Sequence, residues 1–197
     1  MLRKQLYPAV MMTLVLCVIT GFLYPGAVTA LAQLLFPRQA NGSLVTVNGR
    51  VVGSALIGQP FTRPEYFHPR PSAAGRGYDA TASAGSNAGP TDARLAATLI
   101  AARVDSAVAL DGATKGHVPS DMVTASASGL DPHVSPANAR LQVARVARAR
   151  GVDAAAVRRI VDAHTEGRQF GLFGEPRVNV LLLNVALDSA LGRRRAP

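Results

Sequence analysis

One uncharged stretch near the N-terminus constrains this chain more than any other feature. Between Lys4 and Arg38 lie 33 residues without a charged side chain, and 23 of the 31 side chains from Leu6 to Phe36 are apolar. An α-helix rises 1.5 Å per residue, so about 20 apolar residues cross a bilayer core of about 30 Å. We therefore predict one membrane-spanning helix over Leu6–Phe36, which makes the lipid bilayer a partner of this chain.

Residues inside this stretch indicate where the helix meets the two bilayer surfaces. Tyr7 and Tyr24 are 17 residues apart, about 26 Å along a helix, which matches the spacing of the two interfacial aromatic belts. Proline lacks the amide hydrogen that a helix interior needs, so Pro25-Gly26 is expected to kink or end the span. Residues 27–36 are then expected to continue as an interfacial or partly protein-packed helix up to Pro37.

A cleaved secretory signal is the alternative interpretation of the same segment. Arg3 and Lys4 provide a basic start, and Ala30-Leu31-Ala32 offers a small-x-small cleavage site. The apolar core of a signal peptide is only about 7–15 residues long, however, and the stretch here is about twice that. A retained membrane anchor is therefore favoured.

The charges that flank the helix predict its orientation. Arg3 and Lys4 immediately precede the span, which places residues 1–5 in the cytoplasm because positive flanks stay inside. Residues 37–192 then form an extracytoplasmic domain, followed by a basic tail over residues 193–197. The only cysteine, Cys17, lies within the span, so the outer domain has no thiol with which to form a disulfide.

The outer domain is expected to be a single α+β domain with long loops. Asn48-Gly49 lies between two apolar runs and predicts a β-hairpin over residues 44–52, since both residues tolerate the positive φ of a type I′ turn. The second strand could continue through residues 55–57 to Gly58. Residues 59–90 are rich in Pro, Gly, Ser and Ala and are expected to form a loop. Its aromatic residues, which predict that this loop packs against the domain, are Phe61, Tyr66, Phe67 and Tyr78.

Capping residues and glycines predict three or four helices after this loop. The expected helices run from the cap at Thr91-Asp92 to Leu110 before Asp111-Gly112, from Ser135-Pro136 to Gly151, from Asp153 to Gly167, and over residues 177–191 after Pro176. Residues 118–133 are expected to form a second loop. For the last segment the alternation of Val178, Val180 and Leu182 is equally consistent with a buried strand.

The net charge of +9 and the sequence pI near 11.0 suggest nucleic-acid binding, but the distribution of the charge argues against it. Two positive charges flank the span, three lie in the tail at Arg193–Arg195, and only +4 is spread over residues 38–192. The helices predicted on either side of Gly151-Val152 superficially resemble a helix-turn-helix. We interpret them as an αα-hairpin with a solvated arginine face and predict no nucleic-acid partner. The arginines concerned are Arg145, Arg148, Arg150, Arg158 and Arg159.

The sequence offers little support for catalysis or for a metal site. The four histidines lack the spacing of metal ligands, so no metal site and no catalytic residue is predicted. A membrane-anchored extracytoplasmic hydrolase that uses Ser126 or Ser128 with His133 is the alternative function, although the chain has no G-x-S-x-G elbow. A small-residue loop is a weak candidate for holding an anion on its backbone amides. Its residues are Ser83, Gly85, Ser86 and Asn87.

Taken together, the loop segments resemble the KdpC family from the N-terminal span to about Asp188. The matching segments, in chain order, are GSALIGQ (53–59), YFHPRPS (66–72), YD (78–79), SAGSN (83–87), DMVTASASGLDPHVSP (121–136), HTEGR (164–168), GEPRVNVL (174–181) and NVALD (184–188). The sequence departs from the common family pattern at Ala84 and Ala127, where glycine is usual. The departure at Ala84 weakens a nucleotide-binding role for the loop over Ser83–Asn87.

The resemblance implies a non-catalytic, single-span subunit of the Kdp potassium pump in the bacterial inner membrane. Its implied partners are a channel-like potassium-binding subunit and a P-type ATPase subunit, which handle potassium and ATP. The family is also described as a catalytic chaperone that raises the ATP affinity of the ATPase subunit, which conflicts with an extracytoplasmic domain. The residues that we select as interface candidates are Arg70, Asn87, Asp131, Arg177 and Asn179, and Arg70 and Asp131 are also candidates for an ion pair.

Overall fold

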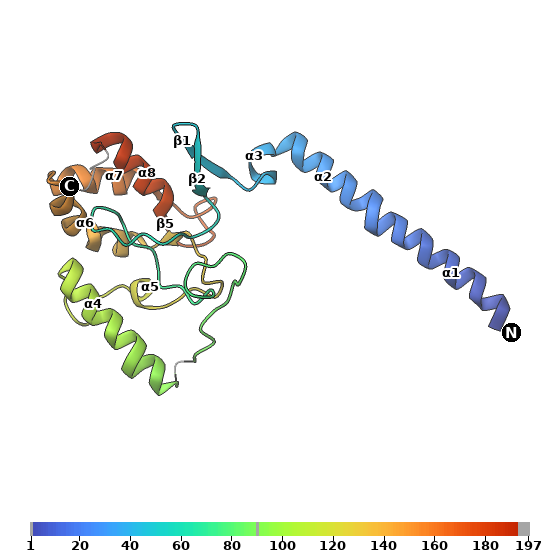
Figure 1. Cartoon of the computed structure of the whole chain (residues 1–197), viewed down its shortest axis with the longest axis horizontal. Coiled ribbons are helices and arrows are strands. Elements are labelled where there is room, and N and C mark those ends of the chain that lie inside the picture. Colours follow the sequence, from blue (N-terminus) through green and yellow to red (C-terminus); the bar gives the residue numbers. More distant parts are fainter. Residues whose placement is uncertain (1, 90, 193–197) are drawn as a thin grey trace. The chain divides into compact units, whose positions relative to one another are not determined.

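The computed structural model describes residues 2–89 and 91–192. The chain divides into two compact units, Met1–Leu44 and Val45–Pro197, and each is described by itself. Figure 1 shows the first as helix and the second as helices with short strands and long loops. The predicted α+β class is confirmed for the described residues.

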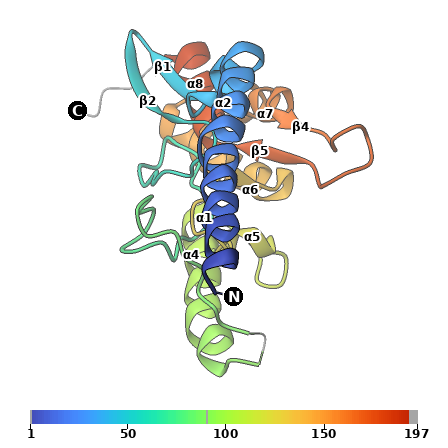
Figure 2. The ribbon, with the colours of Figure 1, turned by 90° about the vertical axis from the view of Figure 1, so that its right-hand side faces the viewer.

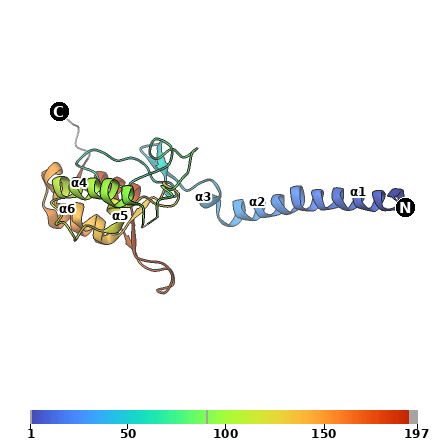
Figure 3. The ribbon, with the colours of Figure 1, turned by 90° about the horizontal axis from the view of Figure 1, so that it is seen from below.

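The first unit is built around one long apolar helix. It consists of α1 (Leu2–Val18), the π-helical turn η1 (Ile19–Leu23) and α2 (Tyr24–Leu35), which Figure 3 shows as one continuous helix, and the short α3 (Pro37–Ala40) follows. The segment Lys4–Leu35 has 32 residues and a mean hydropathy of 2.1, and none of its most apolar part is buried in the structure. This length corresponds to about 48 Å of helix, which is more than a bilayer core requires. The prediction of a helix able to span a membrane is therefore confirmed by length and composition.

The expectation that the helix continues past Pro25-Gly26 towards Pro37 is confirmed. The helix continues to Leu35, and Pro25 lies in the first turn of α2 directly after the π-helical turn. In that turn the amide of Tyr24 donates to the carbonyl oxygen of Ile19, five residues back. A widened turn of this kind accommodates a proline because it changes the carbonyl–amide pairing where the proline has no hydrogen to offer. The helix ends where Phe36 leaves helical geometry before Pro37.

The predicted hairpin is present, with a shorter second strand than expected. Strand β1 (Leu44–Val47) and β2 (Arg50–Ser54) flank Asn48 and Gly49, whose φ values of 51° and 76° are those of a type I′ turn. The extension to Gly58 is wrong, because the side chain of Ser54 accepts a hydrogen bond from the amide of Leu56 and turns the chain.

Residues 59–89 form no helix or strand, as predicted, and they pack against the domain. Phe67 is fully buried in the main core, and Phe61 packs against that core with its ring 5.8 Å from the ring of Tyr66. The aromatic cluster therefore fastens the loop to the domain, as the sequence predicted.

The helices that follow agree with the predicted caps, with two corrections. The elements are η2 (Leu95–Ile100), α4 (Ala101–Asp111), α5 (Ser120–Val123), β3 (His133–Val134), α6 (Pro136–Arg150), α7 (Ala154–Ala163), β4 (Thr165–Glu166), β5 (Arg177–Asn179) and α8 (Val180–Leu191). The second predicted loop contains the helical turn α5, so its description as pure loop is wrong. Helix α7 ends before Gly167 because Thr165 and Glu166 instead pair with β5.

The last segment, residues 177–191, contains both structures that the sequence left open, a strand followed by a helix. Arg177–Asn179 is a strand, and the side chain of Asn179 accepts a hydrogen bond from the amide of Leu182 and so caps α8. Strand β5 lies between β3 and β4 in an antiparallel sheet, with Val178 opposite both Val134 and Thr165. Figure 2 shows this sheet beside α6, α7 and α8. The core between them contains Val143, Val146, Val157, Val161, Val178, Leu183 and Leu187 together with Phe67.

Candidate interaction surface

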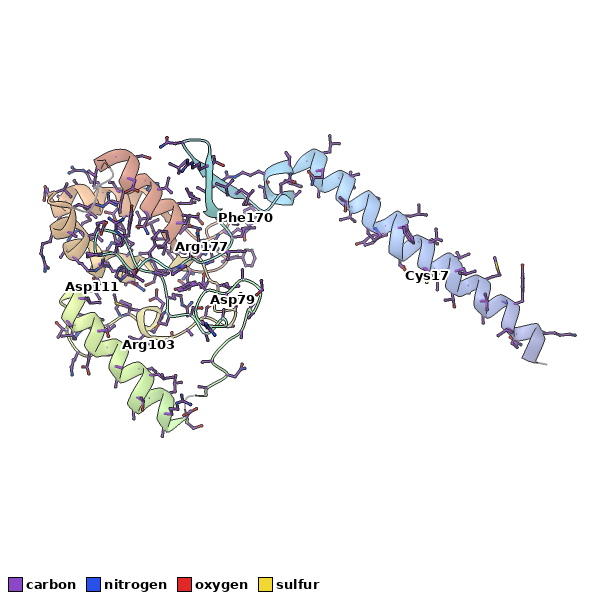
Figure 4. All side chains as sticks on the ribbon, viewed as in Figure 1. Cys17, Asp79, Arg103, Asp111, Phe170 and Arg177 are labelled. Atoms are coloured by element: carbon purple, nitrogen blue, oxygen red, sulfur yellow. The ribbon has the colours of Figure 1, made fainter. Side chains whose placement is uncertain are left out.

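Two buried arginines of α6 hold the long loop of residues 59–89 against the helices. The Arg145 side chain is almost entirely buried and forms an ion pair of 2.7 Å with Asp111, which lies at the end of α4 (Figure 4). The same guanidinium donates to the carbonyl oxygens of Pro64 and Tyr66 at 2.7 and 2.9 Å and to Gln142 at 2.6 Å. Each of the three guanidinium nitrogens therefore donates a hydrogen bond to a group of the domain itself.

Arg150 lies about one and a half turns further along α6 and also holds the long loop against the helices. Its guanidinium donates to Asp188 of α8 at 2.8 Å and to the carbonyl oxygen of Glu65 at 2.8 Å. It also lies 5.1 Å from the ring centre of Tyr66, whose hydroxyl donates to Asp188 at 2.9 Å. The loop is thus connected to two helices through a single charged network.

These contacts correct the prediction of a solvated arginine face on the αα-hairpin. Arg145 and Arg150 are buried, whereas Arg148, Arg158 and Arg159 are exposed as expected. The sequence carried one usable signal for Arg145, because it lies three residues after Gln142 on a helix face that also carries Asn138. A helix side that carries polar residues among alanines and valines can face a buried network as well as solvent.

The ion pair predicted between Arg70 and Asp131 is present. The guanidinium and carboxylate are 3.0 Å apart and join the loop of residues 59–89 to residues 124–132. Asp131 also accepts a hydrogen bond of 2.9 Å from the amide of His133. Burial raises the pKa of Asp131, but the hydrogen bonds from His133 and the charge of Arg70 outweigh it and hold the pKa below its ordinary value.

Around this ion pair, the loop of residues 59–89 and residues 124–132 approach each other closely. The hydroxyl of Ser72 donates to the carbonyl oxygen of Gly129 at 2.6 Å and accepts from the amides of Ala74 and Tyr78. The Tyr78 hydroxyl donates to the carbonyl oxygen of Arg70, and burial raises the pKa of this tyrosine. The two loops consequently form one ordered surface.

The small-residue loop is packed on the same surface. The hydroxyl of Ser83 and the amide of Ala84 both donate to the carbonyl oxygen of Ser128, at 3.0 Å each. Gly85 lies so close to Ala127 that an added Cβ would be 2.8 Å from its carbonyl oxygen. Ser86 and Asn87 remain exposed. An anion site on this loop stays a prediction, and the contacts show that part of the loop serves packing.

The other interface candidates differ in their exposure to solvent. Arg177 is exposed and pairs with Glu166 at 3.0 Å across β4 and β5. Asn179 is buried, and its side-chain amide donates to the carbonyl oxygen of Ala55 at 2.8 Å. Asn179 therefore acts inside the domain, whereas Arg177 and Asn87 are on its surface.

A small hollow between α4, α5 and α6 contains the one histidine that contacts the arginine network. His68 lies beside Arg145, with 3.4 Å between its Nε2 and the guanidinium, and its backbone amide donates to Gln142 at 2.7 Å. Burial and the charge of Arg145 lower the pKa of His68 below its ordinary value. At neutral pH this imidazole is uncharged and acts as part of the packing.

The serine-hydrolase alternative has no geometric support. Ser126 and Ser128 lie 3.5 Å from each other through their hydroxyls, and Ser128 accepts a hydrogen bond from the amide of Leu130. Within residues 2–89 and 91–192 neither hydroxyl hydrogen-bonds to a histidine, and these residues contain no group of three or more potential metal ligands. What the domain presents is a surface of packed loops.

Comparison with known proteins shows that the chain is similar to subunits of a transport system. The family model described as "K+-transporting ATPase, c chain" matches residues 6–189. A potassium-transporting ATPase KdpC subunit from Gemmatimonas aurantiaca is 65% identical over 95% of this chain and 94% of its own length. Proteins of the same name from Myxococcus xanthus and Koribacter versatilis are 62% and 52% identical, over 89% and 95% of this chain and 83% and 95% of their own lengths.

Proposed function

The chain belongs to the KdpC family of K+-transporting ATPase c chains, and from this premise we propose that it is the single-span accessory subunit of a bacterial potassium-uptake complex. Proteins of this family are subunits of the potassium-transporting ATPase and are not themselves catalytic. The observation that carries the proposal is the family match over residues 6–189, which includes both the apolar helix and the domain.

The partners in this proposal are a channel-like potassium-binding subunit and a P-type ATPase subunit. Potassium and ATP are handled by those partners, while this chain supports assembly and activity of the complex. The internal contacts of the domain support such a structural role. Its buried charges, Arg145, Arg150 and Asp111, are all engaged in hydrogen bonds within the domain, as expected of a scaffold that holds a surface in one shape.

We propose that the chain spans the inner membrane once, with residues 1–5 in the cytoplasm and the domain of residues 37–192 outside. The apolar segment Lys4–Leu35 supports a span, and the charges of Arg3 and Lys4 before it support the orientation. The basic tail over residues 193–197 lies outside the described residues and is placed with the outer domain.

This orientation determines how the chain can affect ATP use. A domain outside the membrane does not reach cytoplasmic ATP, so any increase in the ATP affinity of the ATPase subunit has to be transmitted through the complex. We propose that the domain packs on the outer face of the channel-like subunit, near the ion entrance. Asn87 and Arg177 are the exposed members of the interface candidates, and Arg70 and Asp131 hold the loop surface that carries Asn87.

Cysteine labelling in intact cells tests the orientation. In a Cys17→Ala background, a cysteine at the exposed position Ala144 on α6 is expected to react with a membrane-impermeant maleimide. A cysteine at Gln5, before the span, is expected to react only after the cells are permeabilised. Labelling of the Gln5→Cys variant with protection of the Ala144→Cys variant would overturn the proposed topology.

A further inference from the structure

The loop between β4 and β5 carries an apolar tip that the domain does not use. Phe170, Leu172 and Phe173 are 89%, 69% and 61% exposed, and we call these three residues the apolar tip. Figures 2 and 3 show this loop standing out from the rest of the domain, and Figure 4 labels Phe170 on it and Arg177 at the start of β5. Large apolar side chains that gather on one exposed loop indicate an interaction site.

Backbone hydrogen bonds form a tight turn at the apolar tip. The amide of Gln169 donates to the carbonyl oxygen of Phe173 at 2.8 Å, and the amide of Phe173 donates back at 2.9 Å. Between them Phe170 and Gly171 have φ values of 55° and 73°, which form a turn with two left-handed residues. A phenylalanine is disfavoured in this region. The backbone conformation of Phe170 is therefore energetically unfavourable, and the turn exposes its ring to solvent.

The charges beneath the apolar tip neutralise each other. Residues 166–177 contain four charged side chains, and all four are paired. Arg168 contacts both carboxylate oxygens of Glu175 at 2.7 and 2.8 Å, and Arg177 contacts Glu166 at 3.0 Å. The loop consequently offers no unpaired cation to attract the anionic headgroups of a lipid surface.

We propose that the apolar tip docks into an uncharged apolar socket on the outer face of the channel-like subunit. A fixed turn with neutralised flanks fits a shaped protein pocket, because preorganisation reduces the ordering cost of binding and aromatic side chains are efficient anchors. Binding to a fluid lipid surface would gain nothing from the shape of the turn or from the absence of unpaired positive charge. The inference rests on the proposed function, and it assigns the partner contact to these three residues.

Photo-crosslinking in the assembled complex tests this assignment. Benzoylphenylalanine replaces Phe170 in the full-length chain, which is co-expressed with the channel-like and ATPase subunits and irradiated in membranes. The matched control carries the same probe in place of Leu110, which is 53% exposed on α4. We expect a protein adduct with a partner subunit from position 170 and little from position 110. Lipid adducts alone, or no adduct from position 170, would overturn the inference.

A second variant separates docking from folding and from the proposed function. The triple change Phe170→Ser, Leu172→Ser and Phe173→Ser is expected to leave thermal unfolding of the chain unchanged and to reduce recovery of the partner subunits about tenfold. Unchanged recovery would overturn the role of the apolar tip. If the unaltered chain itself recovers no partner subunit, the proposed function fails instead.

Discussion

At the scale of single residues, the buried charge of Arg145 joins the long loop to the helices. It is enclosed by Asp111, by Gln142 and by two carbonyl oxygens of the long loop. Its contribution is therefore to fix the position of a loop that has no helix or strand of its own. Removing one member of such a buried pair leaves the other charge without compensation, which is more costly than losing both.

Replacement of Arg145 by methionine tests this role. We expect Arg145→Met to lower the free energy of unfolding by about 3–5 kcal/mol, because Asp111 becomes an uncompensated buried charge. The measurement is urea unfolding of the full-length chain in mild detergent. Arg158→Met on the exposed side of α7 is the matched control and should change stability by no more than about 0.5 kcal/mol.

The double variant Arg145→Met with Asp111→Leu makes the same test more specific. Because it removes both charges, it should be more stable than Arg145→Met alone. Equal stability of the single and double variants would show that Asp111 does not depend on Arg145 for compensation.

At the scale of elements, local signals in the sequence predicted the ends of helices and the hairpin turn well. Ser135 and Asp153 accept hydrogen bonds from the amides of Asn138 and Ala155 as N-caps, and Gly151 ends α6 at a φ of 65°. These interactions form within a few residues, so the sequence window contains both partners.

Features that depend on distant partners were not predictable in the same way. The end of α7 before Gly167 depends on the pairing of Thr165 with Val178, and the burial of Arg150 depends on Asp188 in α8. Of the interface candidates, Arg70 and Asp131 were correctly linked as an ion pair, but the internal role of Asn179 depends on Ala55, far away in the sequence. A short stretch of sequence does not contain both partners of such a contact and therefore does not predict it.

The packing of the two loops makes a prediction at this scale. Gly129 has a φ of 66°, and an added Cβ would lie 2.6 Å from the backbone of both Ala74 and Ala84. Gly129→Ala is therefore expected to destabilise the domain by about 1–3 kcal/mol and to expose residues 76–89 to proteolysis. The readouts are urea unfolding and limited trypsin digestion.

Gly167→Ala is the control for this substitution, since an added Cβ there meets no atom within 4 Å. It should leave both stability and the digestion pattern close to those of the unaltered chain. If Gly129→Ala and Gly167→Ala had similar effects, this would contradict the claim that the loops pack too closely at Gly129 for a side chain.

At the scale of the whole molecule, the uncharged stretch that first constrained the chain fits its family and its helix. The segment Lys4–Leu35 is apolar and exposed along its length, and the domain of residues 45–192 has its own core. The positive charge that suggested nucleic acid instead serves in part to hold the domain together, through Arg145 and Arg150. We conclude that this chain is the accessory subunit of a potassium-transporting ATPase.

Purification of the complex through this chain tests that claim most directly. The chain carries an affinity tag and is expressed with the proposed channel-like and P-type ATPase subunits, and the membranes are dissolved in mild detergent. We predict that both larger subunits are recovered in constant proportion and that the preparation has potassium-stimulated ATPase activity, which is lost when this chain is left out. Recovery of the tagged chain alone, with full activity in the preparation that lacks it, would contradict this conclusion.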